Sequence, residues 1–463
     1  MPEKPRNPKR WKTLQITRIG SQAVFLSLFV LLFLLSLDPF SATVNPFLRF
    51  DPLILLTSLR TDTGTLLPVI GIVIFTLVAG RFFCGWVCPL GAIIDLVDLL
   101  LKPLRRINPV SKISSSVLRK LYSCPPSLFI LGGLVATVFF MPPVLQFFHP
   151  HVWIIRIFSL SGSGLFFLGF LFVISGISRR LWCTHLCPLG AFYGALGSLS
   201  LFRLDITRCS SCETCNTCPT GAALFEARRV SSFRCILCFD FEHRCPANGF
   251  SYGVRRIGYD GSRRDFLKVA GATAAALGAG IAAGTVLSLL DRSKKTVLLR
   301  PPGVKDEETF VKRCLRCFQC VRSCPNSIIR VTGLEAGLDS LGTPHIEFGD
   351  YGCDYYCQVC QTVCPNLAIP LLPLHVKQEA KIGRASIDES LCVVYAKTTS
   401  CIVCEEFCPV PEKAVKLTAR EIRRGAEKIV LQYPVVDRHL CIGCGICEAN
   451  CPAYPVAITV KKI

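Results

Sequence analysis

The cysteines constrain this chain more than any other feature. There are 28 of them in 463 residues, and most stand in short C-x-x-C runs that close with Cys-Pro. Two runs have the full bacterial ferredoxin spacing C-x₂-C-x₂-C-x₃-C-P. These are motif 1 (Cys314, Cys317, Cys320 and Cys324) and motif 4 (Cys441, Cys444, Cys447 and Cys451).

Two further runs between them vary the same pattern. They are motif 2, with one extra residue in its first gap (Cys353, Cys357, Cys360 and Cys364), and motif 3, with a distant first cysteine (Cys392, Cys401, Cys404 and Cys408). The four motifs predict α+β ferredoxin-like domains with four [4Fe–4S] clusters, in which three ligands surround one cluster and the fourth reaches a neighbour. Structural zinc usually shows paired C-x₂-C motifs, and disulfides are the other alternative. The spacing does not show which motifs pair.

A smaller segment, 206–261, carries two incomplete motifs. The first is one residue short in its last gap, and the second has Phe241 where its middle cysteine is expected. If ligands are exchanged, one cluster is held by Cys209, Cys212, Cys215 and Cys245. A second would have only Cys218, Cys235 and Cys238, as a [3Fe–4S] centre or with Asp240, His243 or an outside cysteine as fourth ligand. We expect two clusters; the alternative is one cluster plus spare thiols.

The first part of the chain predicts a polytopic α-helical membrane domain. Hydrophobic residues make up 51% of the sequence and charged residues 18%. Apolar runs at 19–37, 66–83, 127–148 and 160–177 each approach the length that crosses a bilayer. Basic residues gather before the first run, between the second and third, and after the fourth. The positive-inside rule therefore places the N-terminus and the segment after residue 178 in the cytoplasm. Buried helices of a soluble core are the alternative.

An export signal stands in the middle of the chain. Ser262-Arg263-Arg264-Asp265-Phe266-Leu267-Lys268 has the twin-arginine pattern and precedes an apolar run at 269–290. We expect this run to remain as a fifth span, reached by the twin-arginine export machinery, although cleavage is the alternative. The predicted domains are a membrane module (1–205), a cytoplasmic iron–sulfur segment (206–261), the signal and anchor (262–290) and a periplasmic four-cluster domain (291–463) of a bacterial inner-membrane protein.

The membrane module contains an internal repeat. "RFFCGWVCPLGAIID" at 81–95 (arm 1) is followed by "RRLWCTHLCPLGAFYG" at 179–194 (arm 2). We expect each C-x₃-C gap to lie on a helical turn at the cytoplasmic edge, with both sulfurs on one face. We name the cysteines of the two arms the four-thiol group; they are Cys84, Cys88, Cys183 and Cys187. This group can share a cluster or lend ligands to the neighbouring segment; the alternative is four plain thiols kept reduced at the helix ends.

The sequence lacks the motifs that several other redox functions require. The chain has no C-x-x-C-H for haem attachment, no histidine well inside an apolar run and no glycine-rich dinucleotide fingerprint. The formal charge of +20 counts cysteine as neutral, whereas each [4Fe–4S]²⁺ centre with four thiolates carries about −2. The basic excess is therefore weak support for an anionic partner, and we expect no nucleic acid.

The first half resembles the NapH/MauN family of membrane ferredoxin-type proteins through its two C-x-x-x-C-P-L-G-A repeats. The second half, from Ser262-Arg263-Arg264 through "RPPGVKDEETFVKRCLRCFQCVRSCP" to Cys451, is similar to the NapG/MauM ferredoxins. The chain resembles a fusion of the two, which accounts for the internal export signal. The resemblance implies oxidation of quinol from the membrane pool and electron delivery to a periplasmic redox enzyme, of nitrate-reductase type or similar, or to a cytochrome.

Two other functions stay open. One is a conduit that takes electrons from a cytoplasmic donor to the periplasm for maturation or regulation of a partner enzyme, and the other is a scaffold or redox sensor. Quinol oxidation would need a proton acceptor near the membrane face. The candidates, each of which alone is more simply a solvated or helix-end residue, are Asp38, Asp51, Asp62, His149 and His151 outside and Asp95, Asp98 and His185 inside.

Overall fold

In the computed structural model the chain divides into two compact units, Met1–Leu34 with Asn45–Leu290, and Leu35–Val44 with Asp291–Ile463. The residues that the structure describes are 8–35, 47, 51–53, 63–107, 149–158, 162–177, 179–206, 218, 220–224, 229–239, 250–254, 278, 282, 285, 297–337, 339–424 and 427–463. The expected span at 127–148 lies outside them, as does the anchor at 269–290 except for three single residues.

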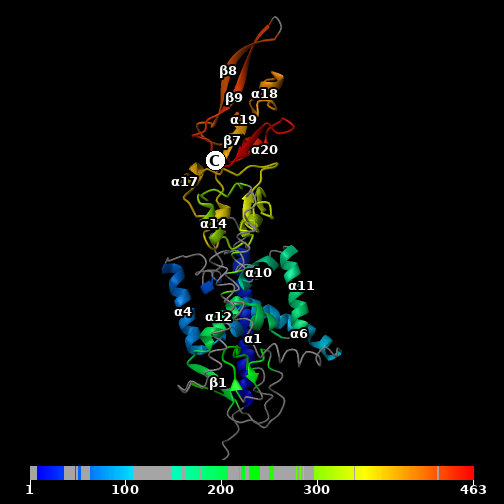
Figure 1. Cartoon of the computed structure of the whole chain (residues 1–463), viewed down its shortest axis with the longest axis vertical. Helices are drawn as coiled ribbons and strands as arrows, with labels where there is room; N and C mark the ends of the chain where they lie inside the picture. Colours follow the sequence, from blue (N-terminus) through cyan, green and yellow to red (C-terminus); the bar gives the residue numbers. More distant parts are fainter. Residues whose placement is uncertain are drawn as a thin grey trace, which may run out of the picture. The chain divides into compact units, whose positions relative to one another are not determined.

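The first unit is helical before its small sheets. Its helices are α1 (Pro8–Leu35), α4 (Thr63–Ala79), α5 (Phe82–Trp86), α6 (Pro89–Ile107), α10 (Pro150–Phe158), α11 (Gly162–Ile177), the π-helix η1 (Trp182–Leu186) and α12 (Pro188–Gly197) (Figure 1). The run expected at 66–83 is broken at Gly80, where the backbone turns into the left-handed region with φ of 76°. α6 packs against α10 and α11, and α12 packs against α4.

Among the described residues, one helix is long and apolar enough to cross a membrane alone, the Thr13–Leu35 part of α1. α10 and α11 pass the same test only as a pair, bent by 115°, and the apolar Leu66–Ala79 part of α4 is shorter. Large apolar side chains on these helices point outward: Leu67 of α4 is 70% exposed and Phe166 of α11 is 78% exposed. Outward apolar side chains are typical of a surface that meets lipid or another protein.

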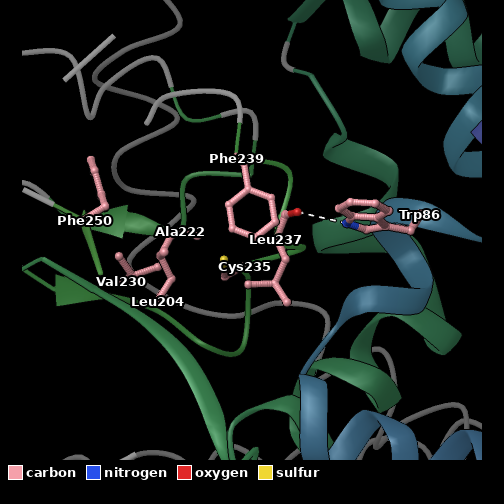
Figure 2. Packing of buried hydrophobic residues seen from close by; sticks show 8 residues of the cluster. All are labelled: Trp86, Leu204, Ala222, Val230, Cys235, Leu237, Phe239 and Phe250. Carbon is pink, nitrogen blue, oxygen red and sulfur yellow. Dashed lines mark hydrogen bonds between the residues drawn. The ribbon is translucent and has the colours of Figure 1, made fainter. Parts of the chain in front are cut away.

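Two short antiparallel sheets follow in the first unit. β1 (Phe202–Ile206) pairs with β4 (Phe250–Val254), and β2 (Ala223–Leu224) pairs with β3 (Arg229–Val230). Their apolar side chains gather with Trp86 of α5 into one core (Figure 2). The Trp86 indole Nε1–H donates to the carbonyl oxygen of Leu237 over 3.0 Å. This bond connects the inner loop, which carries Cys235 and Cys238, to arm 1.

The second unit is an α+β assembly of short elements. They are α14 (Glu307–Arg313), α15 (Gln319–Ser323), β5 (Ile329–Val331), β6 (Pro344–Ile346), α16 (Val359–Thr362), α17 (Leu374–Glu379), β7 (Arg384–Ile387), α18 (Val393–Lys397), α19 (Val403–Glu406), β8 (Val415–Arg424), β9 (Glu427–Val436), α20 (Ile446–Ala449) and β10 (Ile458–Lys461).

The cysteine motifs of the second unit alternate with hairpins. β5 and β6 pair between motifs 1 and 2. The longer hairpin of β8 and β9, labelled in Figure 1, follows motif 3 and precedes motif 4 in the chain. β7 pairs with the last strand, β10, so the second pair of motifs is enclosed by its own terminal strands. The cores are built from cysteines and aliphatic side chains together, as in the group of Phe310, Ile369, Cys314 and Cys364.

Candidate functional site

The second unit gathers its sixteen motif cysteines into four groups. Cys364 of motif 2 lines one cavity with three cysteines of motif 1. In return, Cys324 of motif 1 lies with three cysteines of motif 2. Burial raises the pKa of Cys360, and the neighbouring thiols that raise it further are Cys353, Cys357 and Cys324. We name these groups quartet 1 (Cys314, Cys317, Cys320 and Cys364) and quartet 2 (Cys353, Cys357, Cys360 and Cys324).

Motifs 3 and 4 exchange their last cysteines in the same way. Cys451 lines a cavity with three cysteines of motif 3. Cys408 lies beside Cys441 and Cys444: burial raises the pKa of Cys444 to about 11, and Cys408 and Cys441 are the thiols that add to this. These are quartet 3 (Cys392, Cys401, Cys404 and Cys451) and quartet 4 (Cys441, Cys444, Cys447 and Cys408). The pairing that the sequence left open is therefore motif 1 with motif 2 and motif 3 with motif 4.

The spacing of the sulfurs separates the candidate metals. Around a tetrahedral zinc ion, with Zn–S bonds of about 2.3 Å, neighbouring sulfurs would lie about 3.8 Å apart. In the described part of the chain, no three cysteine sulfurs lie within 4.8 Å of one another; Asp51, His149 and His151 form the one group of three or more candidate ligands that does. The wider quartets fit a polynuclear iron–sulfur cluster, to which thiolates would supply the ligands.

The backbone also forms a cradle at these motifs. In motif 1 Arg316 and Phe318 have φ of 54° and 64°, and in motif 4 Gly443 and Gly445 have φ of 68° and 74° at the same two positions. Left-handed backbone costs a non-glycine residue of order 1 kcal/mol or more. Because both motifs accept this conformation, and one of them with bulky side chains, the loop is shaped for a bound group.

The incomplete inner motif has the same cradle. Leu237 and Phe239 have φ of 52° and 54°, at the positions that correspond to Arg316 and Phe318. Burial raises the pKa of Cys235, and the nearest thiols that add to this are Cys238 and Cys218. The structure thus brings together the three cysteines expected for the second inner cluster. Outside the described residues lie Cys209, Cys212, Cys215, Cys245, Asp240, Phe241 and His243.

The four-thiol group of the two arms is also brought together. Burial raises the pKa of Cys88, followed by the influence of Cys84 and Cys183, and Cys187 lies near the other three. The expected single helical turn is wrong, however: α5 and η1 end before Cys88 and Cys187, and α6 and α12 begin at the prolines that follow. Proline disfavours the α conformation for the residue before it, so the backbone of each motif changes direction at its second cysteine.

Two arginines, one from each arm, join the repeats reciprocally. The guanidinium of Arg81 donates to the carbonyl oxygen of Cys183 over 3.0 Å, and that of Arg180 donates to the carbonyl oxygen of Cys84 over 2.9 Å. Both side chains are 1% exposed. Each arm thereby holds the first cysteine of the other in place, a role for which the sequence carries no signal beyond the repeat itself.

The two arms differ where the inner segment meets them. Arg180 also donates to Asp95 over 2.9 Å, whereas the residue of arm 2 that corresponds to Asp95 is Gly194. A Cβ there would lie 2.8 Å from the carbonyl oxygen of Phe233, to which Arg81 donates over 2.7 Å. The backbone of the inner segment thus takes the place of a carboxylate, and only a glycine leaves room for it.

Two buried cations lie beside quartets of the second unit. Lys377 donates to the carbonyl oxygen of Tyr355 over 3.0 Å and lowers the pKa of Cys353, which burial raises to about 12. Arg316 donates to the carbonyl oxygen of Cys314 over 3.1 Å. Burial lowers the pKa of Arg316 to about 10, which still leaves it charged at neutral pH. Positive charge beside a cluster favours its reduced form.

The candidate proton acceptors are not all placed alike. Asp38 and Asp62 lie outside the described residues. Asp95 binds Arg180 and Arg18, Asp98 binds Arg179, and the His185 imidazole lies 2.7 Å from the Thr184 hydroxyl. The other three candidates come together in one buried group: Asp51, His149 and His151.

Comparison with known proteins places these sites in a family. The chain is 34% identical over 206 residues to the ferredoxin-type protein NapG of Escherichia coli (strain K12), covering 43% of this chain and 86% of that protein. The chain belongs to the NapG/MauM family of ferredoxin-type proteins. A methylamine utilization ferredoxin-type protein MauM of Methylobacillus flagellatus is 33% identical over 165 residues, 35% of this chain and 68% of the relative.

The membrane-side half of the predicted fusion has a relative too. The methylamine utilization ferredoxin-type protein MauN of the same Methylobacillus is 34% identical over 168 residues, 35% of this NapG/MauM-family chain and 56% of MauN. Models of 4Fe-4S binding domains match residues 61–108 with 160–207 and residues 433–458, and a 4Fe-4S dicluster model matches 313–368. No solved structure matches the chain. The protein is an iron–sulfur electron-transfer protein, as the resemblance predicted.

Proposed function

We propose that this protein takes electrons from membrane quinol and passes them to a periplasmic redox enzyme. The observation that carries the proposal is the pairing of complete cysteine quartets in the second unit, together with a buried four-thiol group inside an apolar helical unit. Iron–sulfur clusters supply one-electron transfer when bound. The names of the relatives, ferredoxin-type proteins of which several serve methylamine utilization, are consistent with this role.

The first unit would be a polytopic membrane module. The outward apolar side chains of α1, α4 and α11 support this, since a soluble helix normally buries its apolar face. With the N-terminus in the cytoplasm, the twin-arginine pattern at 262–268 would follow the fourth span, on the side where export begins. The run at 269–290 would then place the four-cluster domain in the periplasm.

The cofactors would be four [4Fe–4S] clusters in quartets 1 to 4 and one or two in the inner segment. The protein's part is to hold the thiolates and exclude water, and the described cysteines of these sets are all buried or partly buried. Burial favours the neutral thiol, as in the pKa of about 11 for Cys364, so cluster binding must release protons. The four-thiol group would hold a further centre or lend ligands to the set of Cys218, Cys235 and Cys238.

The test is low-temperature electron paramagnetic resonance of the purified full chain. Reduced menaquinone and ubiquinone analogues are added anaerobically, and dithionite sets the fully reduced reference. The proposal predicts reduced-cluster signals with quinol. If quinol produces none while dithionite does, the electrons have another source and quinol oxidation is contradicted.

A second candidate is a conduit fed by a cytoplasmic donor. What favours it is the docking of the inner cysteine loop onto the four-thiol arms, through Trp86 to Leu237 and Arg81 to Phe233. A reduced soluble ferredoxin or flavodoxin in the same experiment distinguishes the two candidates. Reduction by that donor, with none by quinol, would favour the conduit.

A further inference from the structure

Three ligand-type side chains from distant parts of the first unit converge in its interior. Asp51 follows the first apolar run, whereas His149 and His151 flank the start of α10, about a hundred positions later. The His151 Nδ1 lies 2.8 Å and the His149 Nε2 lies 3.2 Å from the same Asp51 oxygen, Oδ2. Both imidazoles therefore aim at one point rather than at separate partners.

This group is sealed from solvent. The side chains of Asp51, His149 and His151 are 0%, 2% and 1% exposed. The rings of Phe47 and Phe83 each lie 6.4 Å from the His151 ring. Buried polar atoms normally find partners, and leaving one without costs about 1–3 kcal/mol.

Within the described part of the chain, that requirement is met only in part. His149 Nδ1 and His151 Nε2 have no hydrogen-bond partner there, and the remaining nitrogen of each ring faces the same Asp51 oxygen, Oδ2. The other carboxylate oxygen of Asp51, Oδ1, accepts from the backbone N–H of Leu53 over 2.9 Å. The carboxylate is thus oriented from behind, with Oδ2 directed at the two imidazoles, as an outer hydrogen bond orients a metal ligand.

We propose that Asp51, His149 and His151 bind a single divalent transition-metal ion. Around an ion with N and O ligands at about 2.0–2.2 Å, neighbouring ligand atoms lie about 3.3 Å apart. The three ligand atoms here all lie within 4.8 Å of one another, so small side-chain shifts suffice. Two imidazoles and one carboxylate form the donor set of many iron(II) and zinc sites with an open coordination position.

The ion would lie next to the four-thiol group. The Phe83 ring, whose residue precedes Cys84, lies 5.2 Å from the Tyr193 ring. Burial raises the pKa of Tyr193, and Asp51, Cys84, Cys88 and Cys187 raise it further, so this phenol lies within electrostatic reach of both groups. The metal site is independent of the proposed quinol chemistry, since it rests on the three ligands alone.

The test uses the ratio of metal to inorganic sulfide in the full chain. Clusters of the [4Fe–4S] type contain iron and sulfide in equal amounts, and a [3Fe–4S] centre has one sulfide more than iron. The mononuclear ion is therefore read as the metal that wild type holds, at equal sulfide content, in excess of the Asp51→Asn variant. The purified protein is incubated anaerobically with Fe²⁺ or Zn²⁺, desalted and analysed for all first-row metals. We expect one ion per chain in excess for wild type and for the control His375→Ala, whose residue is exposed on α17.

The variants Asp51→Asn, His149→Gln and His151→Gln should each lose that excess while keeping their sulfide. Sulfide content shows that the rest of the chain has folded. A wild type without excess metal overturns the site, as does an excess that all three variants retain.

If the variants fail to fold, Co²⁺ loaded into wild type decides. Ligand-field bands without a strong thiolate charge-transfer band support nitrogen and oxygen ligation. A strong thiolate band places the ion on cysteines and contradicts the proposal.

Discussion

The two units hold their cysteines in different ways. In the second unit each quartet is complete and is drawn from two motifs that one hairpin separates. In the first unit the thiols come from two arms about a hundred residues apart, and the described inner set has three members. Local motifs therefore suffice for the outer sites, whereas the inner sites depend on the packing of the two arms and the inner loop.

The largest expected effect concerns the exchange of ligands between motifs 1 and 2. Cys364→Ser should remove the cluster signal of quartet 1, although Cys364 stands in motif 2, because its sulfur lies with Cys314, Cys317 and Cys320. Cys317→Ser is the matched control and should leave the same residual resonance spectrum. If Cys364→Ser instead matches Cys357→Ser, the exchange is wrong.

The next effect distinguishes the two arms of the first unit. Arg180→Gln loses bonds to the carbonyl oxygens of Cys84 and Gly91 and, in addition, the nearer of the two arginines that bind Asp95, a charged hydrogen bond that contributes about 1.5–3 kcal/mol. Arg81→Gln loses bonds to carbonyl oxygens alone, for about 1–3 kcal/mol. Thermal unfolding of the detergent-solubilised protein should show the larger loss for Arg180. Equal losses would contradict the asymmetry of the arms.

A smaller effect is expected where the inner loop meets arm 1. A Cβ on Gly85 would lie 2.2 Å from the carbonyl oxygen of Ile236, and such overpacking costs about 1–3 kcal/mol. Gly85→Ala should therefore displace the Cys235 loop and reduce the inner cluster signal, with the outer signals unchanged. Gly169→Ala is the control, because nothing lies within 4 Å of its Cβ position. Equal spectra of the two variants would show that the loop does not dock there.

The smallest effect is on a reduction potential in the second unit. Lys377 is 3% exposed and lies beside quartet 2. Lys377→Met removes a positive charge that favours the reduced cluster, so the potential of that cluster should fall by tens of millivolts. Lys397→Met, at an exposed position, should leave it unchanged. A redox titration that shows no difference between the two variants would show that the Lys377 charge does not affect the cluster of quartet 2.

The outer site could be predicted to a large extent from spacing alone. Because the ligands of a ferredoxin run lie within ten or so residues, their identity and the exchange of the last cysteine follow from local geometry. The pairing of motif 1 with motif 2 could not be predicted, since it depends on which hairpin folds back. The corner at Cys88 and Cys187 was predictable from Pro89 and Pro188, and the helical-turn expectation overlooked that signal.

The contacts of the first unit could not be predicted from the sequence, for a physical reason. Arg81 and Arg180 act on residues about a hundred positions away, as does the group of Asp51, His149 and His151. Each of these residues alone resembles an ordinary loop or helix-end side chain. Only tertiary packing brings them together, and neither hydropathy nor spacing records that packing.

The most direct test of the account measures quinol reduction with and without the four-thiol group. The variant has serine at Cys84, Cys88, Cys183 and Cys187, and its outer clusters are compared with those of wild type after anaerobic addition of a quinol analogue and then of dithionite. The account predicts that quinol reduces the outer clusters of wild type only, while dithionite reduces both proteins equally. Equal reduction by quinol in the serine variant would show that electrons reach the outer clusters without the four thiols, and would contradict it.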